Sequence, residues 1–198
     1  MAADAALALP PAAPPARPRV LLVGTVLATG ATLMAFAGLI GLYLSQRAAV
    51  LAQGGDWLPE GVKLPLTPGT IGFATMLISA VTMWWAVDAV GRNDRQMAYL
   101  ALALTMFFGI AVINATSFLY TQMDLPVTST PGVFVFTVTG AHLAMIIVGL
   151  VFAAVMTFRT LGGDYHGRDR EGLTAASMFW YATIAVHAVI WLAIYVTK

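Results

Sequence analysis

Five long apolar stretches alternate with short polar connections from residue 20 to the end of the chain. They cover residues 20–45, 68–90, 97–120, 132–158 and 173–197, and each holds more than 20 residues. An α-helix of about 20 residues, rising 1.5 Å per residue, spans the ~30 Å hydrocarbon core of a bilayer. Alternating segments of about ten residues, the pattern of transmembrane strands, do not occur. The pattern therefore predicts an all-α integral membrane protein with five transmembrane helices.

Composition supports this fold class and limits what lies outside the helices. Of the 198 residues, 60% are hydrophobic and 10% are charged, whereas soluble domains carry about 25% charged residues. The first 19 residues, MAADAALALPPAAPPARPR, are rich in Ala and Pro. Arg17 and Arg19 follow the weakly apolar stretch, the reverse of the order in a signal peptide. We predict a disordered cytoplasmic tail over 1–19 and one transmembrane domain over 20–198.

The distribution of Lys and Arg predicts the orientation of the helices. The tail and the second and fourth connections carry seven of these residues: Arg17, Arg19, Arg92, Arg95, Arg159, Arg168 and Arg170. The opposite side carries three: Arg47, Lys63 and Lys198. This bias places the amino terminus in the cytoplasm and the carboxyl terminus outside. Trp57, Tyr120 and Tyr195 are then interpreted as anchors at the membrane interface.

Composition and motifs exclude most catalytic chemistry for this chain. The sequence has no cysteine, which removes disulfides, thiolate metal sites and iron–sulfur clusters. A net charge of +1 without a basic run argues against nucleic-acid binding. Nucleotide-binding, HExxH and GxSxG motifs are absent. Asp88 and Arg92 fit an i,i+4 ion pair, with a function in proton entry as the alternative, and His166 lies in a polar loop.

Two histidines fall inside the predicted membrane region at the same depth. His142 lies ten residues from the outer end of its stretch and His187 ten residues from the outer end of the last one. By helical rise, both lie about 15 Å below the outer surface. Matched depth is what a bis-histidine haem b would need. The alternative is two neutral histidines that bond neighbouring hydroxyl or carbonyl groups.

Uncharged polar residues in the first and third stretches allow two interpretations. Thr32, Asn114, Thr116 and Ser117 can bond a carbonyl one helical turn back or join helices. They could instead line a path for a small solute. The sequence has no inverted repeat and no interrupted helix pair of the kind that carriers use, so a structural function is favoured.

Three segments resemble subunit III of the haem–copper oxidases, in its short five-helix bacterial form. Residues 139–149, TGAHLAMIIVG, resemble the signature TGxHGxHVxxG, and residues 33–39, LMAFAGL, followed by Tyr43, resemble LMFFAGLFxxY. Residues 179–181 and 190–192 are similar to the ending WHFxDxVWxxLF. The three segments occur in the order of the family, and the resemblance covers about residues 20–198.

The chain departs from that family at its intramembrane ionisable positions. Thr32 stands where the family has Glu, and Asn114 and Ser117 stand for a Gln and a second Glu. Met145 replaces the second histidine of the signature, while His142 keeps the first. His187 is out of register with the family's histidine in the last helix. Any function of the family's carboxylates therefore does not transfer to this chain.

The resemblance implies a non-catalytic subunit of a terminal oxidase that couples oxygen reduction to proton pumping. It implies subunits I and II and membrane phospholipids as partners, and the bacterial inner membrane as location. Haem and copper are expected in subunit I, with copper in subunit II of a cytochrome c oxidase, and none in this chain. Two alternatives stay open: a subunit associated with nitric oxide reductase, and a small cytochrome b with His142 and His187 as ligands.

Overall fold

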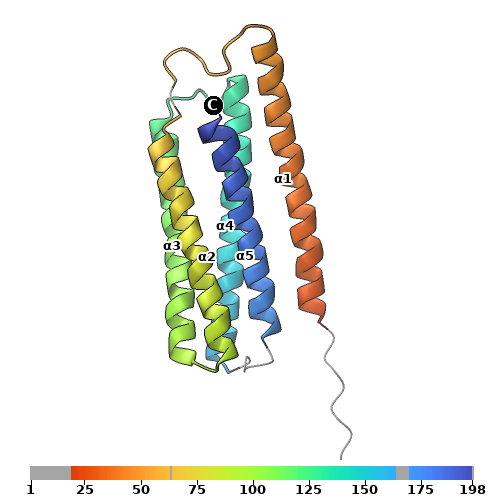
Figure 1. The fold of residues 1–198 in the computed structure, drawn as a ribbon, viewed down its shortest axis with the longest axis vertical. Coiled ribbons are helices and arrows are strands. Elements are labelled where there is room, and N and C mark those ends of the chain that lie inside the picture. The colour runs from red at the N-terminus through yellow and green to blue at the C-terminus, as the bar shows by residue number, and fades with distance from the viewer. Residues whose placement is uncertain (1–18, 63, 164–169, 198) are drawn as a thin grey trace, which may run out of the picture.

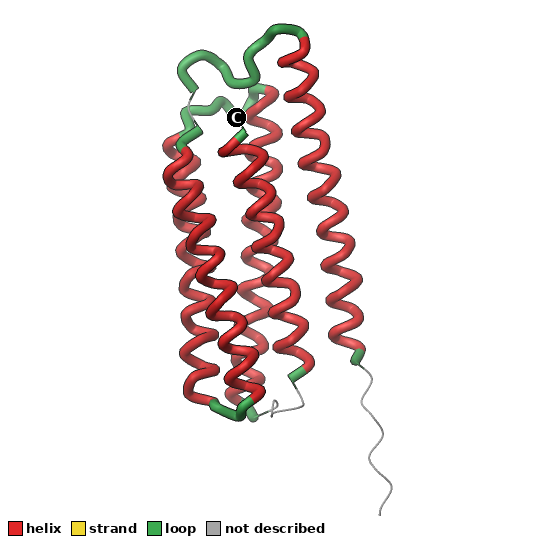
Figure 2. The backbone as a smooth tube through the Cα atoms, in the orientation of Figure 1, coloured by secondary structure: helices red, strands yellow, loops and turns green. Residues whose placement is uncertain are grey.

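The computed structural model describes residues 19–62, 64–163 and 170–197, which form a bundle of long helices (Figures 1 and 2). No strand occurs in these residues. The helices are α1 (Val20–Ala52), α2 (Leu66–Gly91), α3 (Arg95–Gln122), α4 (Thr130–Leu161) and α5 (Glu171–Ile190), and α5 continues into a π-helical segment, η2 (Trp191–Val196).

All five predicted helices are present, and each is long and apolar enough to cross a membrane. They extend past the predicted stretches because a helix continues by its own backbone hydrogen bonds into the polar region of the bilayer. The described chain begins and ends at opposite ends of the bundle (Figure 1). Which end faces the cytoplasm stays a prediction from the Lys and Arg count. The predicted tail, apart from Arg19, and His166 lie outside the described residues.

Polar side chains cap the amino ends of two helices that follow short connections. Asp94 caps α3 by accepting a hydrogen bond from the Met97 amide at 3.1 Å, which satisfies one free N–H of the first turn. Ser129 caps α4 through the Gly132 amide at 3.2 Å. At the same turn as Asp94, the predicted Asp88–Arg92 ion pair is present at 2.9 Å. Arg92 is largely exposed and Asp88 is partly exposed, so the pair adds only a few tenths of a kcal/mol.

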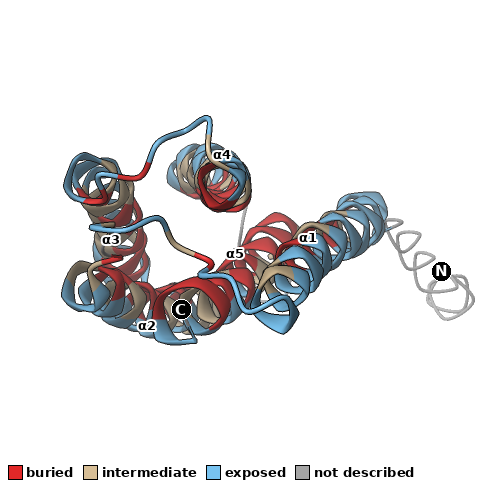
Figure 3. Ribbon diagram, turned by 90° about the horizontal axis from the view of Figure 1, so that it is seen from above, coloured by how far each residue is buried: buried red, intermediate tan, exposed pale blue. Residues whose placement is uncertain are grey.

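The helices are arranged around α5 (Figure 3). Seen along the bundle, α3, α2, α5 and α1 form a curved row, and α4 packs against α5 and α3 on one side of it. In its most apolar window half of the α5 residues are buried, against 17% for α1. The buried positions of α1 form a single stripe: Thr25, Thr29, Phe36, Ile40 and Tyr43. Helix α1 is therefore attached to the bundle along one narrow face.

Trp180 of α5 joins three other helices in the bundle interior. Its side chain is fully buried, and its Nε1 donates to the Ser79 hydroxyl of α2 at 3.1 Å. The indole ring passes over Gly109 of α3 and Gly149 of α4, where an added Cβ would lie 2.8 Å and 2.9 Å from ring atoms. At Gly149 the nearest atoms are those of the ring, whereas at Gly109 the Leu150 side chain of α4 lies closer still, at 2.6 Å. Trp180 therefore limits how closely α4 approaches α5, and Trp180 and Leu150 together limit the approach of α3.

The residue before α5 and the first residue of α5 bind the ends of two neighbouring helices at the predicted cytoplasmic side. Arg170 donates to the Val87 carbonyl near the end of α2 at 3.0 Å, and its guanidinium lies where a side chain on Gly91 would stand. The Glu171 carboxylate accepts from the Leu22 amide in the first turn of α1 at 2.9 Å. A cation at a helix carboxyl end and an anion at an amino end both complement the helix dipole.

Candidate functional site

The two intramembrane histidines meet in the interior of the bundle. The ring centres of His142 on α4 and His187 on α5 are 4.9 Å apart, with the ring planes at 57°. The prediction that they share one depth is therefore confirmed. His142 Nε2 lies 3.1 Å from the Thr183 carbonyl, so this nitrogen carries the proton and donates it. His187 Nδ1 is buried and has no hydrogen-bond partner within the described part of the chain.

Aromatic rings extend the histidine pair to α1 on one side and to α2 on the other. On one side, Phe36 of α1 meets His142 edge-on, with ring centres 6.2 Å apart. On the other, Phe73 of α2 stacks on His187 at 6.2 Å and on Trp191 at 4.9 Å. We call these five rings the ring array. It connects α1, α4, α5, α2 and η2 at one level and adds aromatic contacts to the packing of these helices.

The ring array ends where α5 becomes π-helical. Trp191 is the first residue of η2, and its Nε1 donates to the Thr70 hydroxyl of α2 at 3.2 Å. A π-helical segment is rare and occurs mostly as a single turn within an α-helix, frequently at a functional site. Here the stacked Phe73–Trp191 pair and this hydrogen bond fix η2 against α2.

The histidine pair does not fit the predicted haem alternative. Two imidazoles that bind one metal ion at about 2 Å each keep their ring centres roughly 6 Å apart, whereas these rings are 4.9 Å apart. No space for a porphyrin remains between rings in direct contact. The proton-bearing His142 nitrogen also points to the Thr183 carbonyl. Among the described residues, no group of three or more His, Cys, Asp or Glu side chains could hold a metal ion.

The other predicted site residues are not gathered into one place. Thr32 donates to the Ala28 carbonyl at 2.8 Å, and Ser117 donates to the Ile113 carbonyl at 3.0 Å. Ser117 and Asn114 are exposed on α3, and α3 packs on α2 and α4, whereas α1 packs on α5 and α4. Met145 is buried one turn from His142. The hydroxyl groups thus bond their own helices, as a neutral residue in lipid can.

Two residues interpreted as interfacial anchors are instead buried inside the protein. Trp57 and Tyr195 are each only 5% exposed. The connection between α1 and α2, which carries Trp57, passes over the predicted outer end of the bundle (Figure 1). Tyr120 is half-buried and donates to the Thr139 hydroxyl on α4 at 2.8 Å. Hydropathy alone could not reveal these contacts, since an aromatic residue near a helix end fits either location.

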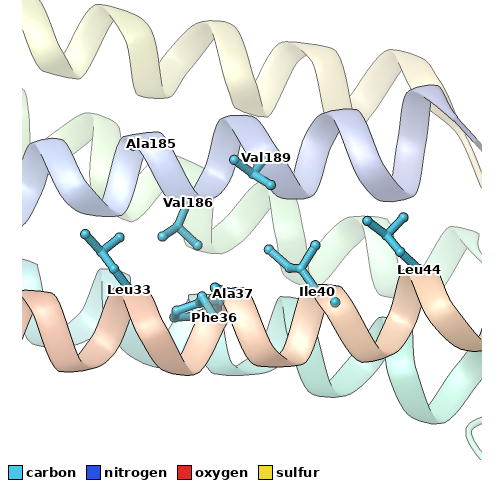
Figure 4. Close-up of a pocket in the computed structure, with 9 residues that line it drawn as sticks. Leu33, Phe36, Ala37, Ile40, Leu44, Ala185, Val186 and Val189 are labelled. Atoms are coloured by element: carbon cyan, nitrogen blue, oxygen red, sulfur yellow. The ribbon is translucent and has the colours of Figure 1, made fainter.

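A narrow groove separates the middle of α1 from α5 (Figure 4). Its volume is about 350 Å³ and its walls are apolar. Leu33, Ile40 and Leu44 of α1 point across the gap toward Val186 and Val189 of α5. Phe36, Ala37, Gly41 and Ala185 complete the lining. Phe36 therefore belongs to both the groove and the ring array.

Comparison with known proteins identifies the family. The sequence pattern of the cytochrome c oxidase subunit III family matches residues 17–198. Cytochrome c oxidase subunit 3 of Cyprinus carpio is 30% identical over 161 residues, which are 78% of this chain and 59% of that protein. The same subunit of Pongo abelii is 28% identical over 186 residues, 89% of this chain and 68% of that protein. The chain spans about three-fifths of the length of the Cyprinus carpio protein and of several other relatives. With the family pattern present from residue 17 to residue 198, the chain belongs to the cytochrome c oxidase subunit III family.

Proposed function

We propose that this chain is a non-catalytic, subunit III-like component of a haem–copper terminal oxidase in the bacterial inner membrane. The observation that carries the proposal is the family match over residues 17–198. In this proposal subunits I and II are its partners. The complex passes electrons from cytochrome c or quinol to oxygen and pumps protons, and its haem and copper lie in subunits I and II.

The polar groups of the transmembrane helices favour a structural function. His142, Thr32 and Ser117 are each engaged with a backbone carbonyl, and the ring array links four helices through contacts between side chains. Removing a carboxylate from the membrane interior also removes the cost of burying its charge, several kcal/mol when it is unpaired. We therefore assign the chain to assembly and support of subunit I, with no redox step of its own.

Phospholipid binding is the second part of the proposal. The groove between α1 and α5 lies near the middle of a helix that spans residues 20–52, at the depth of the hydrocarbon core. Its apolar walls suit an acyl chain and offer almost nothing to a polar solute. Because α1 is attached along one stripe, a lipid chain in this groove would add contacts that the protein alone lacks.

A complex with a nitric oxide reductase is the competing proposal. It is favoured by the neutral residues Thr32, Asn114 and Ser117 at the positions of the family's carboxylates, since a partner without the oxidase's proton uptake would not require them. The two proposals assign the same structural function to this chain and differ in the large subunit that it accompanies.

Affinity purification of this chain from its native membrane in mild detergent tests both proposals. We expect a large subunit to co-purify, with a reduced-minus-oxidised haem spectrum that disappears when this chain is isolated alone. Mass spectrometry of the partner separates an oxidase from a reductase. A haem b spectrum retained by the isolated chain, or purification without any large redox subunit, would refute the proposed function.

A further inference from the structure

Asn114 of α3 presents a carboxamide to the outside of the bundle at a depth where lipid offers no hydrogen bond. It is the only Asn or Gln within the five apolar stretches. The residue is exposed, and its side chain makes no hydrogen bond within the described part of the chain. It lies six residues inside the predicted outer end of the stretch 97–120, about 9 Å by helical rise. A polar group that faces hydrocarbon without a partner is costly.

The neighbours of Asn114 on the helix surface extend this feature into a stripe. Phe107, Ile110, Asn114, Ser117 and Thr121 follow one another at intervals of three or four residues, so they share one face of α3. All five are exposed, and we call them the α3 outer stripe. The buried residues of α3 lie on the opposite side, where α3 packs on α2 and α4. Helix α3 stands at one end of the curved row of helices (Figure 3).

Neither the lipid headgroups nor the helix itself supplies the missing partner. Lys and Arg reach the membrane interface through their long side chains, whereas the short side chain of Asn cannot cover about 9 Å. The hydroxyl groups of Thr116 and Ser117 bond carbonyls of their own helix at 2.8 Å and 3.0 Å, but the Asn114 carboxamide makes no such bond. The side chain therefore requires a partner on another transmembrane helix, where polar residues commonly bond across helices.

A second copy of this chain supplies that partner with the fewest requirements. All copies are inserted in the membrane in the same direction. A two-fold axis along the membrane normal therefore makes their α3 helices parallel and brings equal residues to equal depth. A carboxamide donates through Nδ2 and accepts through Oδ1, so two of them form a reciprocal pair with complementary partial charges. A single Asn in the apolar seam between parallel helices fixes their register in the same way.

The rest of the α3 outer stripe fits this contact. No residue from 96 to 123 is charged, so two copies approach without repulsion. Phe107 and Ile110, which are 63% and 60% exposed, supply bulky apolar contacts toward the middle of the membrane, and the small Ser117 allows close approach near the outer end. An unlike helix would have to carry a polar residue at this depth, whereas a second copy carries one by identity.

We propose that the α3 outer stripe is the contact between two copies of this chain, with the two Asn114 carboxamides hydrogen-bonded to each other. The contact is independent of the proposed redox partner, because both of its sides belong to this chain. Where the chain accompanies a large subunit, the contact joins two such complexes.

Cysteine cross-linking in native membranes tests the contact, because the chain has no cysteine of its own. We expect the full chain with Asn114→Cys, oxidised with copper phenanthroline, to form a disulfide-linked product of twice the chain mass, and Ser117→Cys to form it as well. Leu42→Cys, at a position of α1 that is 57% exposed, is the control and should stay monomeric. Equal products from Asn114→Cys and Leu42→Cys, or no dimer from Asn114→Cys, would overturn the proposal. So would a cross-link from Asn114→Cys to a different protein, which would assign the stripe to another subunit.

Energy transfer between donor-labelled and acceptor-labelled copies in native membranes measures the strength of the contact. Asn114→Leu removes the donor and the acceptor at nearly constant size, and it should weaken association roughly tenfold. Asn114→Gln keeps the carboxamide and should retain most of the association. Both substitutions lie on an exposed face and leave the packing of the bundle unchanged. Association of Asn114→Leu as strong as that of the wild type would show that the two carboxamides do not pair.

Discussion

Gly149 provides the sharpest test of how the bundle is packed. The ring of Trp180 covers this glycine, and an added Cβ would lie 2.9 Å and 3.1 Å from two atoms of the indole. Trp180 is fully buried and its Nε1 is bonded to Ser79, so a shift of the ring would disturb its packing and this hydrogen bond. Gly149→Ala should therefore overpack the core, at a cost of about 1–3 kcal/mol.

A second glycine on the same helix supplies the control. An added Cβ at Gly140 would meet no atom within 4 Å. Both substitutions gain the same helix propensity, about 1 kcal/mol from Gly to Ala. Their difference therefore isolates the overpacking: Gly140→Ala should be neutral or stabilising, and Gly149→Ala should be less stable than Gly140→Ala by ~1–3 kcal/mol.

Unfolding in mixed micelles of mild detergent and dodecyl sulfate, followed by circular dichroism, measures this difference. Adding Trp180→Phe to Gly149→Ala should give a combined cost smaller than the sum of the two, since the smaller ring relieves the clash and the residues are in contact. Equal stability of Gly149→Ala and Gly140→Ala, or additive costs in the double variant, would refute the conclusion that Trp180 limits how closely α4 approaches α5.

Three further predictions concern other contacts. Gly91→Ala should displace the Arg170 guanidinium from the Val87 carbonyl and cost about 1.5–3 kcal/mol; in an Arg170→Gln background the same unfolding assay should show little further loss. Thr32→Glu should lower the yield of assembled complex in affinity purification more than Thr32→Gln. The Thr32 hydroxyl bonds its own helix, so the site contains no partner for a buried negative charge. Equal yields of the two variants would show that the site still accepts an acid. His142→Ala should destabilise the isolated chain in the micelle assay. Neither the wild-type chain nor this variant should show a Soret band in its absorption spectrum. A Soret band that is present in the wild type and lost in the variant would restore the haem alternative.

The number and class of the helices, and the position of each apolar stretch, followed from the sequence alone. Hydrophobic length is a local property, and a stretch of more than 20 apolar residues in a bilayer must satisfy its backbone groups within itself. The shared depth of His142 and His187 was predicted for the same reason, since helical rise converts residue counts into depth. The family resemblance at residues 139–149 and 33–39 was likewise readable without a structure and is confirmed by the family match.

The contacts between helices were decided only by the tertiary structure. All five helices are apolar nearly all round, so the sequence does not mark which face is buried. Lipid tails are as apolar as a protein interior, and close packing, more than the exclusion of water, selects the partner faces. For this reason three features became visible only in the tertiary structure. They are the contact of Trp180 with Gly149, the burial of Trp57 within the connection between α1 and α2 and the direct contact of the two histidines.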